Sequence, residues 1–277
     1  MDTVTEQNTQ ARRIAIGITL AVILAGGGLW WYLQRPPAVA GPPASEPVAE
    51  APVAAVTPPA ILHPLDIPAT APVDGSAATP VDADALAVSG LTEVFGSGVT
   101  EWLVPEQLMR RLVATTDNLA RATRTESLRP LRAPPGALLV ERSPVDATVG
   151  TERITLAAAN AARYNAPVAL LAATDMSNAA AVYRRMYPQL QSAWEQLGYP
   201  DRYFNDRVVE VIDNLLATPE PAGPVLLEQP KVLYRFADAD LESRTTGQKL
   251  LLRMGVDHAR VVKAKLAEFR ALIVNKE

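Results

Sequence analysis

The apolar residues of this chain are unevenly spread, and their longest unbroken run covers residues 14–33. The run carries no charged side chain and ends in Trp30, Trp31 and Tyr32. A helix rises about 1.5 Å per residue, so this run would span roughly the 30 Å hydrocarbon core of a membrane. Tryptophan and tyrosine favour the membrane–water interface. The pattern therefore predicts a single transmembrane helix at residues 14–33, preceded by a tail of residues 1–13.

The charges that flank this run predict its orientation. Arg12 and Arg13 stand immediately before it, whereas Arg35 is followed by no lysine or arginine until Arg110. Because these residues are enriched on the cytoplasmic side, we expect the N-terminus in the cytoplasm and the rest of the chain across the membrane. The alternative is a signal peptide cleaved at the small residues 38–40. The apolar core of a signal peptide is only about 7–15 residues long, which favours the anchor.

Residues 34–81 show no helical or strand periodicity and contain half of the 24 prolines. Proline removes a backbone donor and keeps the preceding residue out of the helical region. We therefore expect a disordered, extended linker that separates the anchor from a folded domain. The alternative is a ligand for a proline-recognising groove. His63 lies in this linker and is expected to be solvated.

From residue 82 onward, apolar residues recur at intervals of three and four, which is typical of helices that bury one face. Pro105 is expected at the first position of its helix, Pro188 to kink another, and Asp257 to cap the last. That last helix is expected to pack on its own domain, with a small coiled-coil contact as the alternative. Residues 151–164 have the alanine content of a helix and residues 167–173 could begin the next one, but this stretch is ambiguous, and residues 240–255 form a helix or two turns. Predicted helices cover residues 82–96, 102–125, 176–200, 203–221 and 257–273.

Short strands are expected at residues 137–142, 225–228 and 232–236, where apolar and β-branched residues lie between turn signals. The last two strands can pair with each other as a hairpin or with the first. The expected fold is thus mainly α: a helical globular domain at residues 82–277 with a minor β-hairpin or small sheet.

Composition excludes several classes of function. The net charge is −4 and the pI about 5.4, which argues against a dedicated nucleic-acid binder. There is no cysteine, so disulfides, thiol chemistry and cysteine-ligated metals are excluded. His63 and His258 are the only histidines, and neither a zinc site nor a Ser–His–Asp triad through His258 is expected. We therefore expect no metal and no cofactor.

Acidic residues offer the one pattern that could carry catalysis. Asp206, Glu210 and Asp213 fall on the face of the 203–221 helix opposite its apolar side. Three carboxylates in a stripe could bind a cation or act as an acid–base pair, but a solvated helix face is the expected role. A carboxylate-based hydrolase remains an alternative, and its candidate acids are those at positions 117, 175, 206 and 210. We expect no enzyme and name no catalytic residue.

The connection before residue 204 is the candidate binding site. It combines Tyr199, Arg202 and Tyr203, and loops rich in tyrosine and arginine often carry binding energy. The alternative is a tight aromatic turn that only joins two helices. A tyrosine-lined groove for a peptide or glycan is a further alternative, because six tyrosines occur after residue 160.

Several motifs resemble those of an uncharacterised family of membrane-anchored bacterial proteins, the domain of unknown function 3014. They include ARYNAPVALLAATD, YRRMYPQLQSAWEQLGYP and KVLYRFADADLESRTTGQKLLLRMG, and the resemblance covers about residues 83–274. It implies a single-pass protein of the bacterial inner membrane with a periplasmic helical domain. It implies no activity, so no catalytic residue is transferred.

These patterns favour a non-enzymatic binding or scaffolding module of the bacterial envelope. Its expected partner is an envelope protein or a cell-wall-linked structure. The alternative is a regulatory subunit of a membrane complex that acts through the helix at residues 14–33.

Overall fold

The computed structural model describes residues 60–67, 82–122, 128–133, 136–144 and 152–274. The predicted tail 1–13, the predicted transmembrane helix 14–33 and most of the predicted linker 34–81 lie outside these residues. Within the described ranges, no helix is both long enough and apolar enough to cross a membrane.

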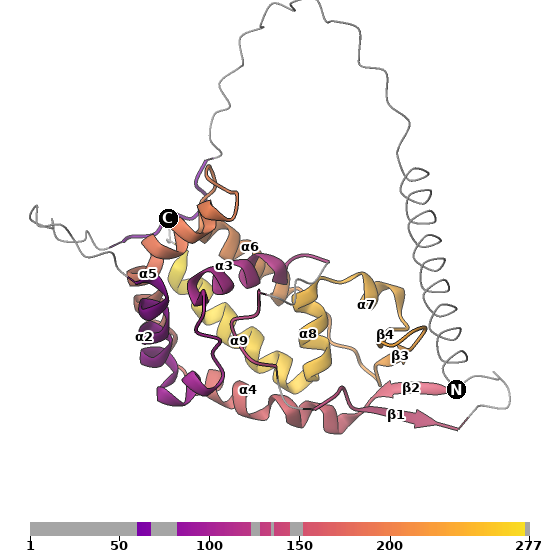
Figure 1. Ribbon diagram of the computed structural model, residues 1–277. Coiled ribbons are helices and arrows are strands. Elements are labelled where there is room, and N and C mark those ends of the chain that lie inside the picture. The colour runs from indigo at the N-terminus through magenta and orange to yellow at the C-terminus, as the bar shows by residue number, and fades with distance from the viewer. Residues whose placement is uncertain (1–59, 68–81, 123–127, 134–135, 145–151, 275–277) are drawn as a thin grey trace, which may run out of the picture. The chain divides into compact units, whose positions relative to one another are not determined.

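Helix α5 (Met176–Gln196) is the centre of the largest core. Its buried side chains follow the spacing expected from the sequence and include Tyr187 and Trp194, which are 1% and 2% exposed. Pro188 lies inside α5, and the helix continues through it. Helices α2 (Ala83–Phe95), α3 (Leu108–Leu119) and α9 (Val256–Ile273) pack directly against α5, as Figure 1 shows.

Helix α9 packs against its own domain rather than offering its apolar side to a partner. It contacts α4, α5, α6 and α8. The remaining helices are α4 (Asn165–Ala172), α6 (Phe204–Leu216), α7 (Ala239–Ser243) and α8 (Thr246–Met254), with 3₁₀ helices η1 (Ser97–Glu101) and η3 (Ala158–Tyr164). The mainly α architecture expected from the sequence is confirmed for the described domain.

The helix boundaries depend on caps, and two of them differ from prediction. Asp82 caps α2 by accepting the N–H groups of Asp84 and Ala85, and Asp175 caps α5 by accepting the N–H of Ser177. Helix α3 begins only at Leu108, because Gln107 adopts a left-handed conformation with φ 55°. Helix α9 is preceded by Gly255 with φ 88°, so Asp257 lies in the first turn rather than at the cap.

The sheet is a four-stranded antiparallel one with the order β1-β2-β3-β4. The stretch 151–164, which the sequence left ambiguous with the alanine content of a helix, contains strand β2 followed by the 3₁₀ helix η3. Arg-Ile-Thr-Leu alternates like a strand, and Ile154 packs onto the small core around Leu227 and Phe236. The last strand is shorter than predicted and leaves residues 232–234 in the loop. The strands are β1 (Val140–Ser143), β2 (Arg153–Leu156), β3 (Leu226–Glu228) and β4 (Arg235–Phe236).

Candidate peptide-binding site at the start of helix α6

Residues 60–67 lie against the helical domain, although the sequence assigned them to a disordered linker. They belong to the same compact unit, Thr57–Glu277, and Figure 1 draws them in indigo. Their hydrogen bonds reach Tyr203, Asn205 and Asp206, at the start of α6. We call these three residues the α6 cradle. For residues 60–67 the structure therefore differs from the linker prediction.

Asp206 holds two consecutive amides of the segment. The Leu62 N–H donates to Asp206 Oδ2 at 3.0 Å, and the His63 N–H donates to Asp206 Oδ1 at 2.7 Å. Each carboxylate oxygen thus accepts one backbone N–H. Hydrogen bonds to an ionised acceptor are shorter and stronger than neutral ones. Asp206 therefore fixes the position and the direction of the segment.

Asn205 joins the segment to the end of α9. Its side chain is fully buried. The Asn205 Nδ2 donates to the His63 carbonyl at 2.8 Å and to the Ile273 carbonyl at 3.1 Å. Its Oδ1 accepts from the Tyr183 hydroxyl at 3.1 Å. Because every polar atom of this amide has a partner, its orientation is fixed, and the segment becomes part of a buried network.

Tyr203 completes the α6 cradle. Its hydroxyl accepts the Leu65 N–H at 3.1 Å, and the Leu65 side chain packs against the main core. All of these hydrogen bonds reach the backbone of the segment, and only Leu65 is held through its side chain as well. The α6 cradle therefore holds the segment mainly through its backbone, which bends at Leu62 and His63, with Leu65 as an apolar anchor.

Side chains of α5 hold the first turn of α6 in place. The Phe204 N–H donates to Gln191 Oε1 at 2.8 Å, and the Asn205 N–H donates to the Tyr187 hydroxyl at 3.1 Å. These bonds satisfy amides that a helix start leaves without an intrahelical partner. Burial raises the pKa of Tyr183 and of Tyr187, so both hydroxyls stay neutral donors. The cradle is thus built on a rigid base.

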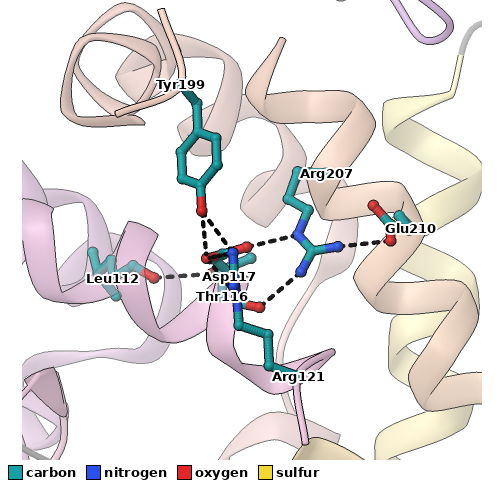
Figure 2. Close-up of polar contacts among 7 residues, drawn as sticks. All are labelled: Leu112, Thr116, Asp117, Arg121, Tyr199, Arg207 and Glu210. Atoms are coloured by element: carbon teal, nitrogen blue, oxygen red, sulfur yellow. Dashed lines mark hydrogen bonds and ion pairs between the residues drawn. The ribbon is translucent and has the colours of Figure 1, made fainter. Parts of the chain in front are cut away.

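A second polar cluster lies beside the cradle, centred on Asp117 of α3 (Figure 2). Asp117 is 7% exposed and accepts from Arg207 Nε at 2.9 Å through Oδ1 and from Arg121 Nε at 2.9 Å through Oδ2. The Tyr199 hydroxyl accepts from Arg121 at 2.6 Å, and Arg207 also pairs with Glu210 at 2.7 Å. The hydrogen bond to Asp117 raises the pKa of Arg121. This cluster ties α3 to α6 as a satisfied ion network.

The acidic stripe of α6 is not a bare solvated face. Asp206 holds the segment, Glu210 pairs with Arg207, and Asp213 accepts both arms of Arg270, at 2.6 Å and 3.0 Å. No group of three or more metal-ligating side chains occurs among the residues that the structure describes. Each of the three carboxylates therefore has a structural partner.

The three residues predicted as a binding site have different environments. Tyr199 stacks on Trp194 with ring centroids 3.9 Å apart. This packing fits the alternative interpretation, in which the connection is a tight aromatic turn between two helices. The Arg202 carbonyl accepts from Gln191, while its side chain is exposed. Only Tyr203 touches the segment. Sequence reasoning missed Asn205 as a contact, and the one signal for the segment was an Ile-Leu-His-Pro-Leu run inside a linker otherwise rich in alanine and proline.

The comparisons with known proteins identify the family and leave its activity open. The profile of the family described as Protein of unknown function (DUF3014) matches residues 108–270, more than half of the chain, and this span includes the whole cradle. No curated protein and no solved structure shows significant similarity to the chain. The match confirms the family expected from the sequence motifs. The chain belongs to the DUF3014 family of proteins of unknown function.

Proposed function

We propose that this protein is a non-catalytic peptide-binding module, which captures a short protein segment in the α6 cradle. The observation that carries the proposal is the docking of residues 60–67 through Asp206, Asn205 and Tyr203. The acids considered for a hydrolase support this reading. Asp117 and Glu210 pair with arginines, Asp175 caps a helix, and Asp206 holds backbone amides.

The contacts define the class of ligand. The cradle needs two consecutive N–H groups, the carbonyl of the second residue and an apolar side chain two positions further on. Proline at position 64 suits this pattern, because it restricts the backbone of His63 and so reduces the conformations that His63 can adopt before binding. A partner segment of the type apolar–X–Pro–apolar would satisfy the same groups.

The surroundings of this module follow from the expected anchor. We propose that residues 14–33 hold the protein in the bacterial inner membrane as a single pass, with residues 1–13 in the cytoplasm and the folded domain in the periplasm. The partner would then be an envelope protein or a cell-wall-linked structure with such a segment. The cis segment lies between the anchor and the domain, so its release would lengthen the tether.

Binding of a synthetic peptide in trans tests the proposal. In the full chain, residues 60–67 are replaced by alternating glycine and serine, which empties the cradle. A fluorescent peptide of residues 58–69 is then titrated, and its anisotropy is recorded. We expect saturable binding that Asp206→Ala weakens at least about tenfold, because it removes two charge-assisted hydrogen bonds.

Two controls sharpen the result. Asp201→Ala removes an exposed carboxylate from the same connection and should leave binding unchanged. A peptide N-methylated at Leu62 and His63 loses both hydrogen-bond donors to Asp206. Its affinity for the chain that retains Asp206 should be no higher than the affinity of the unmethylated peptide for the Asp206→Ala variant. Absence of saturable binding by the natural peptide would overturn the proposal.

A further inference from the structure

The loop that joins β3 to β4 exposes the two most solvent-accessible large aliphatic side chains among the described residues. Val232 is 85% exposed and Leu233 is 80% exposed. Covering one such side chain is worth roughly 1.5–3 kcal/mol, so an adjacent pair in water favours a surface that covers it. The fold itself does not cover this pair.

Hydrogen bonds within the loop and from strand β1 fix the loop in the conformation that exposes these two side chains. The Gln229 Nε2 donates to the Val232 carbonyl at 3.0 Å. Arg142 of β1 donates to Gln229 Oε1 at 2.9 Å and to the Tyr234 hydroxyl at 3.1 Å. Phe236, next to the loop, is 1% exposed and anchors β4 in the core. The hairpin that carries the two aliphatic side chains is therefore held in place by side-chain hydrogen bonds.

Basic side chains surround the exposed pair. A hollow of about 670 Å³ lies between the loop and helices α7 and α8. Its charged lining residues are Lys231, Arg235, Lys249, Arg253 and one acid, Glu242. The lining charge is thus +3 (four cations minus one anion). Two of these cations pair with acids, Lys249 with Glu242 and Arg235 with Glu228. With Glu228 counted, the charge around the exposed pair is +2 (four cations minus two anions), so a surface that covers Val232 and Leu233 meets a rim of net positive charge.

Glu242 is held inside this rim. Burial raises its pKa, but the hydrogen bonds from Lys249 and from the Phe236 N–H outweigh burial, so the pKa of Glu242 is lowered overall. The acid therefore stays ionised and neutralises Lys249, at 2.9 Å. Lys231 lies on the exposed loop, and Arg235, the first residue of β4, pairs with Glu228 of β3.

We propose that this loop docks on an acidic lipid bilayer. Val232 and Leu233 would enter the interface, with Tyr234 at the headgroup level and the basic rim against anionic headgroups. Aliphatic tips flanked by lysine and arginine suit this position, because the long basic stems lie along the apolar layer while their charges stay in the headgroup region. An acidic protein surface is the competing occupant, and an adjacent aliphatic pair at a hairpin tip favours the bilayer.

The absence of native cysteine allows a direct test in the full chain. Val232→Cys is labelled with an environment-sensitive nitrobenzoxadiazole dye, and the chain is reconstituted into vesicles of phosphatidylcholine alone or with roughly 30% phosphatidylglycerol. We expect blue-shifted emission and quenching by lipid-attached quenchers in the acidic vesicles. Ser97→Cys, an exposed position on η1, which packs against α2, should report water in both vesicle types.

Two variants separate the parts of the surface. Leu233→Ser should abolish quenching, and Lys231→Ala should weaken partition into acidic vesicles about fivefold, the effect of one basic residue at such a surface. Equal emission from the Val232 and Ser97 labels in acidic vesicles would overturn the proposal. So would protection of the Val232 label by an acidic polypeptide but not by acidic lipid.

The readout also distinguishes this proposal from the proposed anchor. If the chain fails to float with neutral vesicles, the anchor proposal fails. The same chain added to acidic vesicles would still float through the loop, and Leu233→Ser would abolish that flotation.

Discussion

Replacing Asp206 by alanine should release residues 60–67 from the domain while leaving the helical core folded. Asp206 supplies two of the hydrogen bonds to the segment, from the Leu62 and His63 amides. The His63 amide is half-buried and the Leu62 amide is exposed. Hydrogen bonds to a charged group are worth about 1.5–3 kcal/mol each, and solvent exposure lowers the contribution of the bond from the Leu62 amide. We therefore expect a loss of about 2–3 kcal/mol in docking free energy.

That loss translates into a measurable change in hydrogen exchange. Each 1.4 kcal/mol is a factor of about ten, so the docked-to-undocked ratio should fall roughly 30- to 150-fold. Peptide-level hydrogen exchange of the full chain reads this ratio from the amides at positions 62, 63 and 65. In the natural chain these amides should be protected. In the Asp206→Ala variant they should exchange at nearly the rate of an unstructured peptide.

Asp201→Ala is the matched control, because it removes an exposed carboxylate from the connection that precedes α6. It should leave the protection of residues 60–67 unchanged. Exchange within α5 should be the same in all three proteins, which shows that the core remains folded. Unchanged protection of the segment in Asp206→Ala would refute the cradle as the site that holds it.

Three further substitutions test the packing around the site by urea unfolding. Gly247→Ala should lower the free energy of unfolding by about 1–3 kcal/mol, because the added Cβ would lie 2.9 Å from a backbone carbonyl oxygen of α3. Gly223→Ala is the control and should leave this free energy unchanged, because its Cβ would meet no atom within 4 Å. Asp117→Ala should lower the free energy of unfolding by about 2–3 kcal/mol, because the half-buried guanidinium of Arg207 is then left with only the exposed Glu210 as its ionic partner; a loss within about 0.5 kcal/mol, the usual range for surface substitutions, would contradict this. The pKa of Glu242 is lowered from its ordinary value of 4.5, so its stabilising effect is present above that pH and lost as the pH falls below it. The stability difference between the natural chain and Glu242→Gln should therefore shrink between about pH 7 and about pH 3, and a difference independent of pH would contradict the assignment.

Much of the helical architecture could be read from the sequence because it follows from local periodicity. Helix α5 buries the side chains that recur at three and four positions, and α6 does the same. Strand β2 could not be predicted in this way, since a four-residue strand followed by an alanine-rich stretch carries little periodic signal. Its pairing with β3 joins residues more than 70 positions apart, as in Ile154 with Leu227.

The candidate site was predictable only in part for the same physical reason. The tyrosine-rich connection before α6 pointed to the right region, because Tyr203 belongs to the cradle. The bond between Leu62 and Asp206 spans 144 positions, and no local pattern reports such a contact. Glu210 and Asp213 are exposed, as expected for a solvated face, but the partners of Asp206 and Asp213 come from a segment in the linker and from α9, which no pattern within α6 reports.

Photo-cross-linking in living cells is the measurement that tests the binding function most directly. A photoreactive residue replaces Arg202, whose side chain is exposed next to Tyr203. The full chain is compared with natural residues 60–67 and with these residues replaced by glycine and serine. The proposal predicts an adduct with one defined envelope polypeptide that increases when the cis segment is removed and is lost in Asp206→Ala. An adduct that is unchanged by Asp206→Ala, or no adduct from the emptied cradle, would contradict a peptide-binding role for this domain.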